Sequence, residues 1–430
     1  MRNGQNHGFK RLLDDTDSPT PSVESNNPCQ SVIQTPPGYK QTEVGVIPED
    51  WDAVPLGTVT SDIGDGIHAT PVYSSTGEYY FINGNNLRDG YIVVTEETKT
   101  VEHSEFKKHR KDLGDSSILM SINGTIGNLA LFAGEDVVLG KSAAYLNVKD
   151  SVSKLFVYHS LQTEPVKRQS SDGLTGTTIR NLGLGTIRNT TIALPPTKAE
   201  QETIAEALSD ADALIESLEQ LIAKKRDLKQ GAMKELLTGK KRLPGFSGEW
   251  DEMEIGALCH IEEGEITRGG NTNYLEIGDI DISNKTYGIS GKEKLSVPGS
   301  VKVPAGTLLI STVRPTRGAI TITMETTYVS SAFCRLSIKN YFMFYVVCQN
   351  QFLTYLGENS KGGTYPTCRT DDILRYRCSA PRVPAEQAAI AIILSDMDAE
   401  IAALEAKLAK VRQLKQGMMH NLLTGRIRLI

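Results

Sequence analysis

The chain has 430 residues, of which 46 are lysine or arginine and 52 are aspartate or glutamate, so its formal net charge is −6. This length exceeds what one hydrophobic core usually organises, and it predicts two or more domains. The acidic balance excludes a protein that binds nucleic acid through uniform positive charge, although a local basic patch can still contact phosphate. The longest apolar run, residues 341–348, is too short to span a membrane, so no membrane association is expected.

The six cysteines lie far apart in the sequence, and none of them forms a Cys-x-x-Cys pair. This spacing disfavours a zinc site. No secretory signal precedes them, so we expect reduced thiols and a cytoplasmic location.

The first 37 residues are rich in Ser, Pro, Asn and Gln. Such a segment has too little apolar surface to offset the entropy of ordering the chain. We therefore predict that residues 1–37 are a disordered N-terminal extension.

Residues 38–194 and 244–380 are predicted to be two related domains. The run Trp51-Asp52-x-x-x-Leu56-Gly57 recurs as Trp250-Asp251-x-x-x-Ile255-Gly256, and both runs open regions dense in β-branched residues and glycines. Farther on, 119–121 (Leu-Met-Ser) matches 309–311 (Leu-Ile-Ser), and each is followed by a turn that contains glycine. Each domain then has a short helix-like run with aromatic residues. Both domains are therefore expected to combine strands with short helices.

Each predicted domain is followed by a long charged segment, and the two segments are copies of one another. Residues 195–243 align with residues 381–429 without a gap, and 28 of the 49 positions are identical. Such self-similarity predicts a repeated unit of domain and helix. We assign residues 195–243 and 381–430 to two long spacer helices.

Both copies carry apolar residues at alternating spacings of four and three, as in a coiled-coil seam. The first copy has this seam at Ile204, Leu208, Ala211, Ile215, Leu218 and Ile222, and the second at Ile390, Leu394, Met397, Ile401, Leu404, Leu408 and Val411. About 40 helical residues at ~1.5 Å each form a rod of roughly 60 Å. Gly231 and Gly417 interrupt the two copies, and either is a tolerated glycine or marks close backbone approach to the other helix.

Charge is polarised along each helix in a way that selects an orientation. Residues 198–219 carry seven acids and one base, whereas residues 224–242 carry eight bases and two acids, and the second copy has the same polarity. Antiparallel packing sets acid against base along the whole rod, and parallel packing would set like charges together. The predicted fold is therefore α+β: two mixed α/β domains separated by two long antiparallel coiled-coil helices, with pseudo-twofold symmetry. One turn of B-DNA is about 34–36 Å, so such a rod can place its two domains over two separate half-sites of a bipartite DNA sequence.

These features resemble the specificity (S) subunit of type I restriction–modification systems. The resemblance covers about residues 38–430 and rests on the doubled helix start, the doubled Leu-Lys-Gln-Gly helix end, the Gly-Glu-Trp start of the second domain, and Asp65-Gly66-x-His68-x-x-Pro71. The residues of the helix start are Pro195, Glu200, Gln201, Ile204 and Ala205, and then Pro381, Glu386, Gln387, Ile390 and Ala391.

The resemblance implies a division of labour within a larger complex. The two domains would be target-recognition domains, each reading one half of a bipartite site in double-stranded DNA. The helices would set the spacing and dock two methylation (M) subunits. S-adenosylmethionine, ATP and Mg²⁺ would be held by the M subunits and the motor-nuclease (R) subunits, and this chain would carry no cofactor, metal or catalytic residue.

Two other functions remain alternatives: a stand-alone DNA-modifying enzyme and a coiled-coil scaffold with no DNA role. No amino-methyltransferase motif is found. Residues 134–142 resemble a P-loop, but five residues separate the two motif glycines where the motif has four, and a strand–turn–strand is favoured. Asp62, Asp65 and His68 suggest a metal site, but turn residues or a DNA-facing loop are favoured.

Candidate DNA contacts are polar or basic residues on predicted loops, because such side chains read base edges in the major groove. In the first domain the candidates are His68, Thr70, Asn123, Thr125, Thr178 and Arg180. In the second domain they are Arg314, Thr316, Arg317, Lys361, Thr364, Tyr365 and Arg369.

Overall fold

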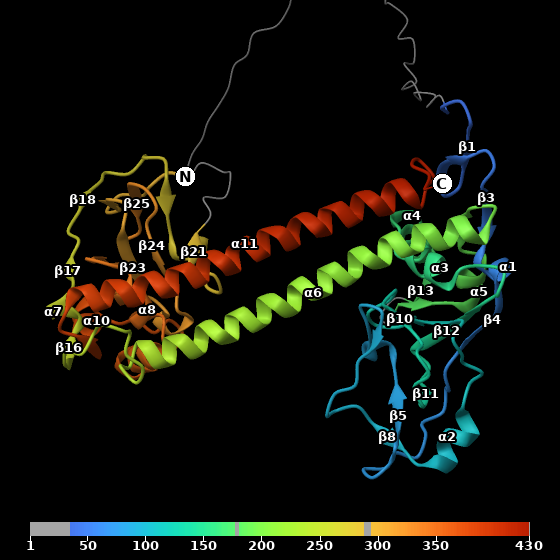
Figure 1. Cartoon of the computed structure of the whole chain (residues 1–430), viewed down its shortest axis with the longest axis horizontal. Helices are drawn as coiled ribbons and strands as arrows, with labels where there is room; N and C mark the ends of the chain where they lie inside the picture. The colour runs from blue at the N-terminus through green and yellow to red at the C-terminus, as the bar shows by residue number, and fades with distance from the viewer. Residues whose placement is uncertain (1–34, 177–179, 288–293, 430) are drawn as a thin grey trace, which may run out of the picture.

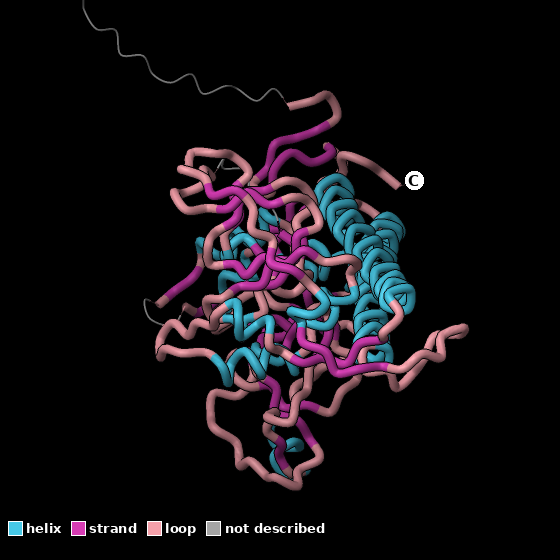
Figure 2. Tube along the Cα trace, turned by 90° about the vertical axis from the view of Figure 1, so that its left-hand side faces the viewer, coloured by secondary structure: helices cyan, strands magenta, loops and turns pink. Residues whose placement is uncertain are grey.

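The computed structural model describes residues 35–176, 180–287 and 294–429. Two strand-rich domains lie at opposite ends of a pair of long helices and point to opposite sides of it (Figure 1). Viewed from one end, the two helices lie side by side along one flank of the domains (Figure 2). Most of the predicted N-terminal extension, residues 1–34, lies outside the described residues.

The rod consists of α6 (Lys198–Leu236) and α11 (Pro384–Leu422), each of 39 residues. They run antiparallel, because acidic residues early in one helix pair with basic residues late in the other. The ion pairs between the two copies are Lys225–Glu400, Arg226–Glu405, Lys229–Asp398, Arg412–Glu219, Lys415–Asp212, Arg242–Glu386 and Arg428–Glu200. Six of the seven form three couples that are related by the same 186-residue offset as the sequence copies, which confirms the pseudo-twofold arrangement.

Every residue of the predicted seam is buried or half-buried. Leu208, Leu218 and Ile222 of α6 and Leu394 and Ile401 of α11 are buried. Helix α6 passes Gly231 and α11 passes Gly417 without interruption, and a Cβ at either glycine would meet no atom within 4 Å. The suggested close backbone approach is therefore wrong, and both are tolerated glycines.

The first domain is built on a four-stranded antiparallel sheet in the order β10-β9-β12-β4 and a three-stranded sheet in the order β11-β5-β8. Their bounds are β4 (Thr60–Asp65), β5 (Tyr79–Ile82), β8 (Thr100–Val101), β9 (Ser117–Ser121), β10 (Leu129–Leu131), β11 (Val137–Leu139) and β12 (Ala143–Val148). The remaining elements are α1 (Leu56–Val59), η1 (Gly84–Asn86), β6 (Leu87–Arg88), β7 (Tyr91–Ile92), α2 (His103–His109), α3 (Lys154–Ser160), α4 (Glu164–Asp172), β13 (Leu174–Thr175), β14 (Asn181–Leu182) and α5 (Leu184–Asn189).

The second domain repeats this plan with two four-stranded sheets, in the orders β17-β26-β23-β24 and β18-β22-β25-β19. Their bounds are β17 (His260–Ile261), β18 (Glu265–Ile266), β19 (Tyr274–Leu275), β22 (Val301–Val303), β23 (Thr307–Ser311), β24 (Ile320–Ile322), β25 (Thr327–Val329) and β26 (Phe333–Ser337). The remaining elements are α7 (Ile255–Leu258), η2 (Ile277–Asp279), β20 (Ile280–Asp281), β21 (Thr286–Tyr287), η3 (Pro315–Arg317), α8 (Phe342–Val347), α9 (Asn350–Asn359) and α10 (Thr370–Leu374).

Each domain is joined to its helix by a two-stranded antiparallel sheet. In the first domain β3 (Asp52–Pro55) pairs with β15 (Thr191–Leu194), and in the second β16 (Trp250–Glu254) pairs with β27 (Arg377–Pro381). A hairpin of β1 (Tyr39–Thr42) and β2 (Gly45–Pro48) precedes the first domain.

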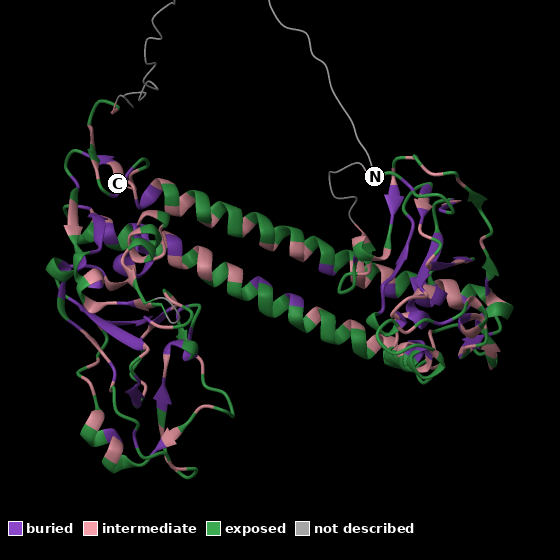
Figure 3. Cartoon of the chain, turned by 180° about the vertical axis from the view of Figure 1, so that it is seen from behind, coloured by how far each residue is buried: buried purple, intermediate pink, exposed green. Residues whose placement is uncertain are grey.

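Both ends of the rod are buried inside the domains, whereas its middle is largely exposed (Figure 3). The start of α6 and the end of α11 share one core with Trp51 and Phe156, and the end of α6 and the start of α11 share another with Phe342 and Phe352. Gly239 and Gly425 follow the helix ends with φ of 69° and 67° and pack against Trp250 and Trp51 respectively. Each helix therefore contributes its start to the core of the domain that precedes it and its end to the core of the other domain. Within the described residues, no helix is long and apolar enough to cross a membrane.

Candidate nucleic-acid interface

Two loops of the second domain that lie about 50 residues apart are joined at its surface. An isolated bridge between Val313 and Thr367 joins the turn after β23 to the loop before α10, and a bridge between Lys361 and Thr367 closes that loop on itself. The backbone N–H of Arg314 donates to the carbonyl of Pro366 at 2.7 Å. Residues 312–318 and 361–369 therefore form one surface unit, which we call the second-domain turn pair.

Arg314 has an unusual conformation within this turn pair. Its φ is 48° and its ψ 52°, in the left-handed region that L residues other than Gly, Asn and Asp rarely occupy. Its guanidinium carbon lies 4.1 Å from the centroid of the Tyr365 ring, which is a close cation–π stack. The Lys285 ammonium donates to the carbonyl of Gly318 at 2.7 Å and holds the far end of the turn.

The second-domain turn pair is strongly basic. It contains Arg314, Arg317, Lys361 and Arg369, and no acidic residue occurs in 311–318 or 360–370. The predicted contacts Thr316, Arg317, Lys361, Thr364, Tyr365 and Arg369 are exposed, and Arg314 is half-buried under its stack. The structure thus brings all seven candidates of this domain onto one surface that is suited to an anionic ligand.

The first domain has an equivalent turn pair, residues 122–127 and 180–182, with different side chains. Asn123 bridges to Asn181, and the N–H of Leu182 donates to the carbonyl of Ile122 at 2.9 Å. Gly124, with φ of 74°, occupies the place that Arg314 occupies in the second domain. Thr125 and Arg180 are exposed, whereas Thr178 lies outside the described residues.

The third candidate loop of the first domain lies next to this turn. Exposed His68 pairs with Asp65, with Nε2 2.8 Å from Oδ2, and Thr70 is exposed beyond it. Ile67 forms a bridge with Gly140. Two residues later, the carbonyl of Ser142 accepts a hydrogen bond from the N–H of Ile122 at 2.9 Å. The His68 loop and the first-domain turn pair are therefore connected through residues 139–142.

Sequence analysis missed several polar residues on this connecting surface. Asn83 accepts a hydrogen bond from the Ser142 hydroxyl at 2.9 Å, and exposed Lys141 lies beside it. Asn83 and Asn85 also line a recess of about 180 Å³ together with Tyr73 and Lys99. The asparagine-rich run 83–86 was the available signal, but its distance of some 60 residues from Ser142 hid the contact.

The other chemical motifs of the sequence have structural roles. Asp62 accepts from the Tyr145 hydroxyl at 2.9 Å, so Asp62 and Asp65 belong to separate pairs. In the part of the chain that the structure describes, no group of three or more His, Cys, Asp or Glu residues could hold a metal ion. The P-loop-like residues 134–142 form strand β11 and the turn into β12, as the strand–turn–strand interpretation predicts. Burial raises the pKa of the Cys259 and Cys334 thiols to about 12, which disfavours the reactive thiolate.

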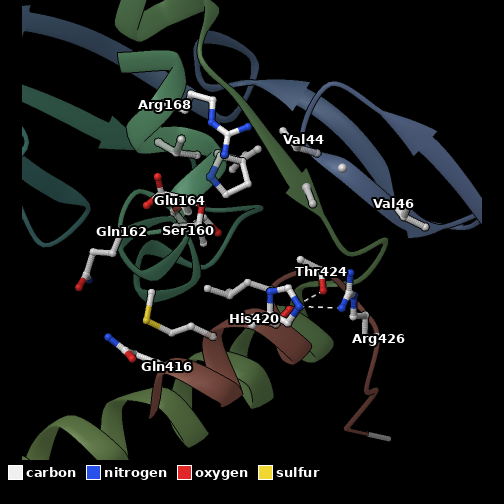
Figure 4. Close-up of a pocket in the computed structure, with 18 residues that line it drawn as sticks. Val44, Val46, Ser160, Gln162, Glu164, Arg168, Gln416, His420, Thr424 and Arg426 are labelled. Carbon is white, nitrogen blue, oxygen red and sulfur yellow. Dashed lines mark hydrogen bonds between the residues drawn. The ribbon is translucent and has the colours of Figure 1, made fainter. Parts of the chain in front are cut away.

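A cleft lies away from the turn pairs, at the junction of the first domain with the rod. This cleft of about 550 Å³ is bounded by the β1–β2 hairpin, α4 and the end of α11 (Figure 4). Val44, Val166 and Met419 contribute apolar walls, and His420 Nε2 lies 2.7 Å from an Arg426 guanidinium nitrogen. The cleft is a joint between domain and rod, and the candidate DNA contacts lie elsewhere.

Comparison with known proteins agrees with this architecture. Residues 48–224 and 247–413 match the model of the type I restriction modification DNA specificity domain, so the chain belongs to that family. It is 23% identical over 414 residues to the type I restriction enzyme MjaVIII specificity subunit of Methanocaldococcus jannaschii, covering 89% of this chain and 94% of that protein. It is 31% identical over 195 residues to the putative type I specificity subunit S.MpnORF638P of Mycoplasma pneumoniae, covering 45% of each chain.

The fold also has a solved counterpart. The crystal structure of a type I restriction–modification S subunit from M. genitalium superposes with a TM-score of 0.58 at 17% identity, covering 86% of this chain and 96% of that one. The family match confirms the resemblance inferred from the doubled helix, and the structural match confirms the predicted fold class.

Proposed function

We propose that this chain is the DNA-reading subunit of a type I restriction–modification complex. One observation carries the proposal: the same paired-turn scaffold occurs at both ends of an antiparallel rod, and the side chains on it differ between the two ends. The second-domain turn pair offers Arg314, Arg317 and Tyr365, whereas the first offers Asn123, Thr125 and Arg180. Two like scaffolds with unlike surfaces suit a site made of two different half-sequences separated by an unread gap.

The rod supports the role of a ruler and a docking surface. Its 39-residue helices span roughly 58 Å at about 1.5 Å per residue, which exceeds one turn of B-DNA. Its exposed middle leaves room for the two M subunits that the resemblance implies. Methyl transfer, ATP-driven translocation and cleavage, with S-adenosylmethionine, ATP and Mg²⁺, are assigned to the M and R subunits, and this chain is proposed to be non-catalytic.

The proposal is tested by methylome sequencing of a host that expresses this chain together with its M subunits. We expect one asymmetric bipartite motif with a fixed gap, and complex–DNA affinity that falls steeply with salt because lysine and arginine contact phosphates. Methyl transfer by the isolated chain would favour a stand-alone enzyme. An assembled complex that bound DNA without sequence preference or salt dependence would favour a scaffold.

A further inference from the structure

We propose that Arg314 reads a guanine in the major groove of the half-site recognised by the second domain, and that Tyr365 positions its guanidinium. This inference rests on the proposed function and names the base chemistry of one half-site. It is carried by the backbone of Arg314, by its stack on Tyr365 and by comparison with the first domain.

The backbone of Arg314 is strained where an equivalent residue is not. Counting from the matched serines Ser121 and Ser311, Arg314 occupies the position of Gly124, and both residues are left-handed, with φ of 48° and 74°. Glycine adopts this conformation without penalty, whereas arginine does not. A strained residue that the surrounding fold tolerates is a signature of functional sites. The first domain forms the equivalent turn with glycine, so the turn itself does not require an arginine. We therefore attribute the presence of arginine at this strained position to a function of its side chain.

The side chain of Arg314 is held in place but its hydrogen-bond donors are not consumed. The guanidinium stacks at 4.1 Å on Tyr365, which is itself 63% exposed. Pro315 follows directly and fixes its own φ, and the Arg314 N–H is bonded to Pro366. No described carboxylate forms an ion pair with Arg314. A guanidinium stacked in this way keeps the N–H groups at its edge free for a ligand that lies in the plane of the guanidinium.

Such a fixed planar fork matches the two acceptors on the major-groove edge of guanine. Arginine donates two parallel hydrogen bonds to O6 and N7 of guanine, and this bidentate contact is the commonest specific one in the major groove. Arginine also binds phosphates bidentately. Loss of a phosphate contact weakens binding to all sequences alike, whereas loss of a guanine contact relaxes the motif at one base. The exposed cations Arg317, Lys361 and Arg369 flank the stack and are placed for the backbone phosphates that position the domain.

The test compares variants in the complete complex with the M subunits, by methylome sequencing and by thermal unfolding. Arg314→Lys keeps the charge but loses the fork, and we expect methylation at the guanine-containing second half-site to fall roughly tenfold or more. Arg314→Gly should lose the same specificity while the unfolding midpoint stays equal or rises. Tyr365→Phe keeps the ring and should resemble the wild type, whereas Tyr365→Ala should relax the same base position. Arg377→Ala, on β27 of the same domain, is the control and should change neither readout.

Several results would overturn the inference. One is a Lys variant with the wild-type motif, which would make Arg314 a phosphate contact. Another is an Arg314→Gly variant with a lower midpoint and an unchanged motif, which would make Arg314 structural. An Arg314 variant that changed the first half-site alone would also contradict the inference. So would a wild-type motif whose second half-site contains no guanine. A wild-type complex with no bipartite motif would instead overturn the proposed function itself.

Discussion

The two domains of this chain are alike where they meet the rod and unlike where they face outward. At the rod, Phe156 and Phe342 occupy the same place, and Trp51 and Trp250 each pack against a glycine that follows a helix end. At the outer surface, the first-domain turn pair carries Gly124 where the second carries the strained, stacked Arg314. The residues that hold the architecture and the residues that face a ligand are thus separate sets. Specificity can therefore change in one domain without disturbing the other or the rod.

Lengthening the rod should change the spacing between the two half-sites without changing the sequence that either domain recognises. We expect insertion of one heptad after residue 221 together with one after residue 407 to add about 10 Å to the rod. Because B-DNA rises 3.4 Å per base pair, the unread gap should grow by about three base pairs while both half-sites stay the same. Methylome sequencing measures this. An unchanged gap in a complex that still methylates would show that the rod does not set the spacing.

Removal of the buried ion pair at the second domain should have the largest effect on stability. Glu386 is 1% exposed, and its carboxylate accepts two hydrogen bonds from Arg242 at 2.7 and 2.8 Å. Arg242→Ala leaves that carboxylate unpaired and should cost about 3 kcal/mol in the free energy of unfolding, measured by urea denaturation. Arg428→Ala, the equivalent change at the first domain, should cost less because Glu200 is less buried. A double variant with Arg242→Met and Glu386→Leu should recover most of the loss, and equal costs for the two single variants would contradict this asymmetry.

The junctions differ at one buried residue, and pH should expose the difference. His159 in the first domain occupies the position that Tyr345 occupies in the second. The Tyr345 hydroxyl donates to Asp398 at 2.8 Å. His159 is 1% exposed, and its Nε2 lies 3.2 Å from the hydroxyl of Ser209. The pKa of His159 is lowered to about 4, mainly by burial. The charge of nearby Lys415 also lowers this pKa, and its effect is larger than the opposite effect of Asp212.

The unfolded chain therefore binds a proton at this histidine more readily than the folded chain. Stability should fall as pH drops from about 6.5 towards 4, by roughly 1 kcal/mol per pH unit relative to the His159→Gln variant. Urea unfolding at pH 7 and pH 5 measures this. Identical pH dependence for the wild type and the variant would exclude the effect.

The smallest effect is expected in the exposed middle of the rod. Arg226 pairs with Glu405 at 2.6 Å, and Arg412 pairs with Glu219 at the symmetric position. Arg226→Glu should cost about 0.5–1 kcal/mol, and adding Glu405→Arg should restore stability because the opposite charges are exchanged. High salt should weaken both results. A double variant no more stable than the single one would argue against charge as the determinant of antiparallel pairing.

Much of the rod could be predicted because its information is local and periodic. The heptad seam and the charge gradient each occupy a single helix, so spacing and sign alone predicted the antiparallel pair. Even the end of the first seam is readable: Lys225 follows Ile222 at the next seam position and pairs with Glu400 at 2.6 Å. Of the two glycine interpretations, close backbone approach was wrong because Gly231 and Gly417 face open space, which a sequence pattern does not reveal.

The candidate interface was only partly predictable because its contacts join distant segments. The residue types of the turns identified Arg314 and Tyr365 separately, yet nothing local to either predicts that one stacks on the other. The left-handed backbone of Arg314 was likewise hidden, because no residue type near it in the sequence predicts a positive φ at an arginine. The bond from Ser142 to Asn83 was missed for the same reason.

The central claim is that the two domains are independent readers on one shared scaffold. The most direct measurement is methylome sequencing of a host in which residues 38–194 are replaced by the corresponding domain of a relative with a different motif. We expect one half of the bipartite motif to change while the other half and the gap remain the same. A change in both halves, or no change in either, in a complex that still assembles and methylates would contradict it.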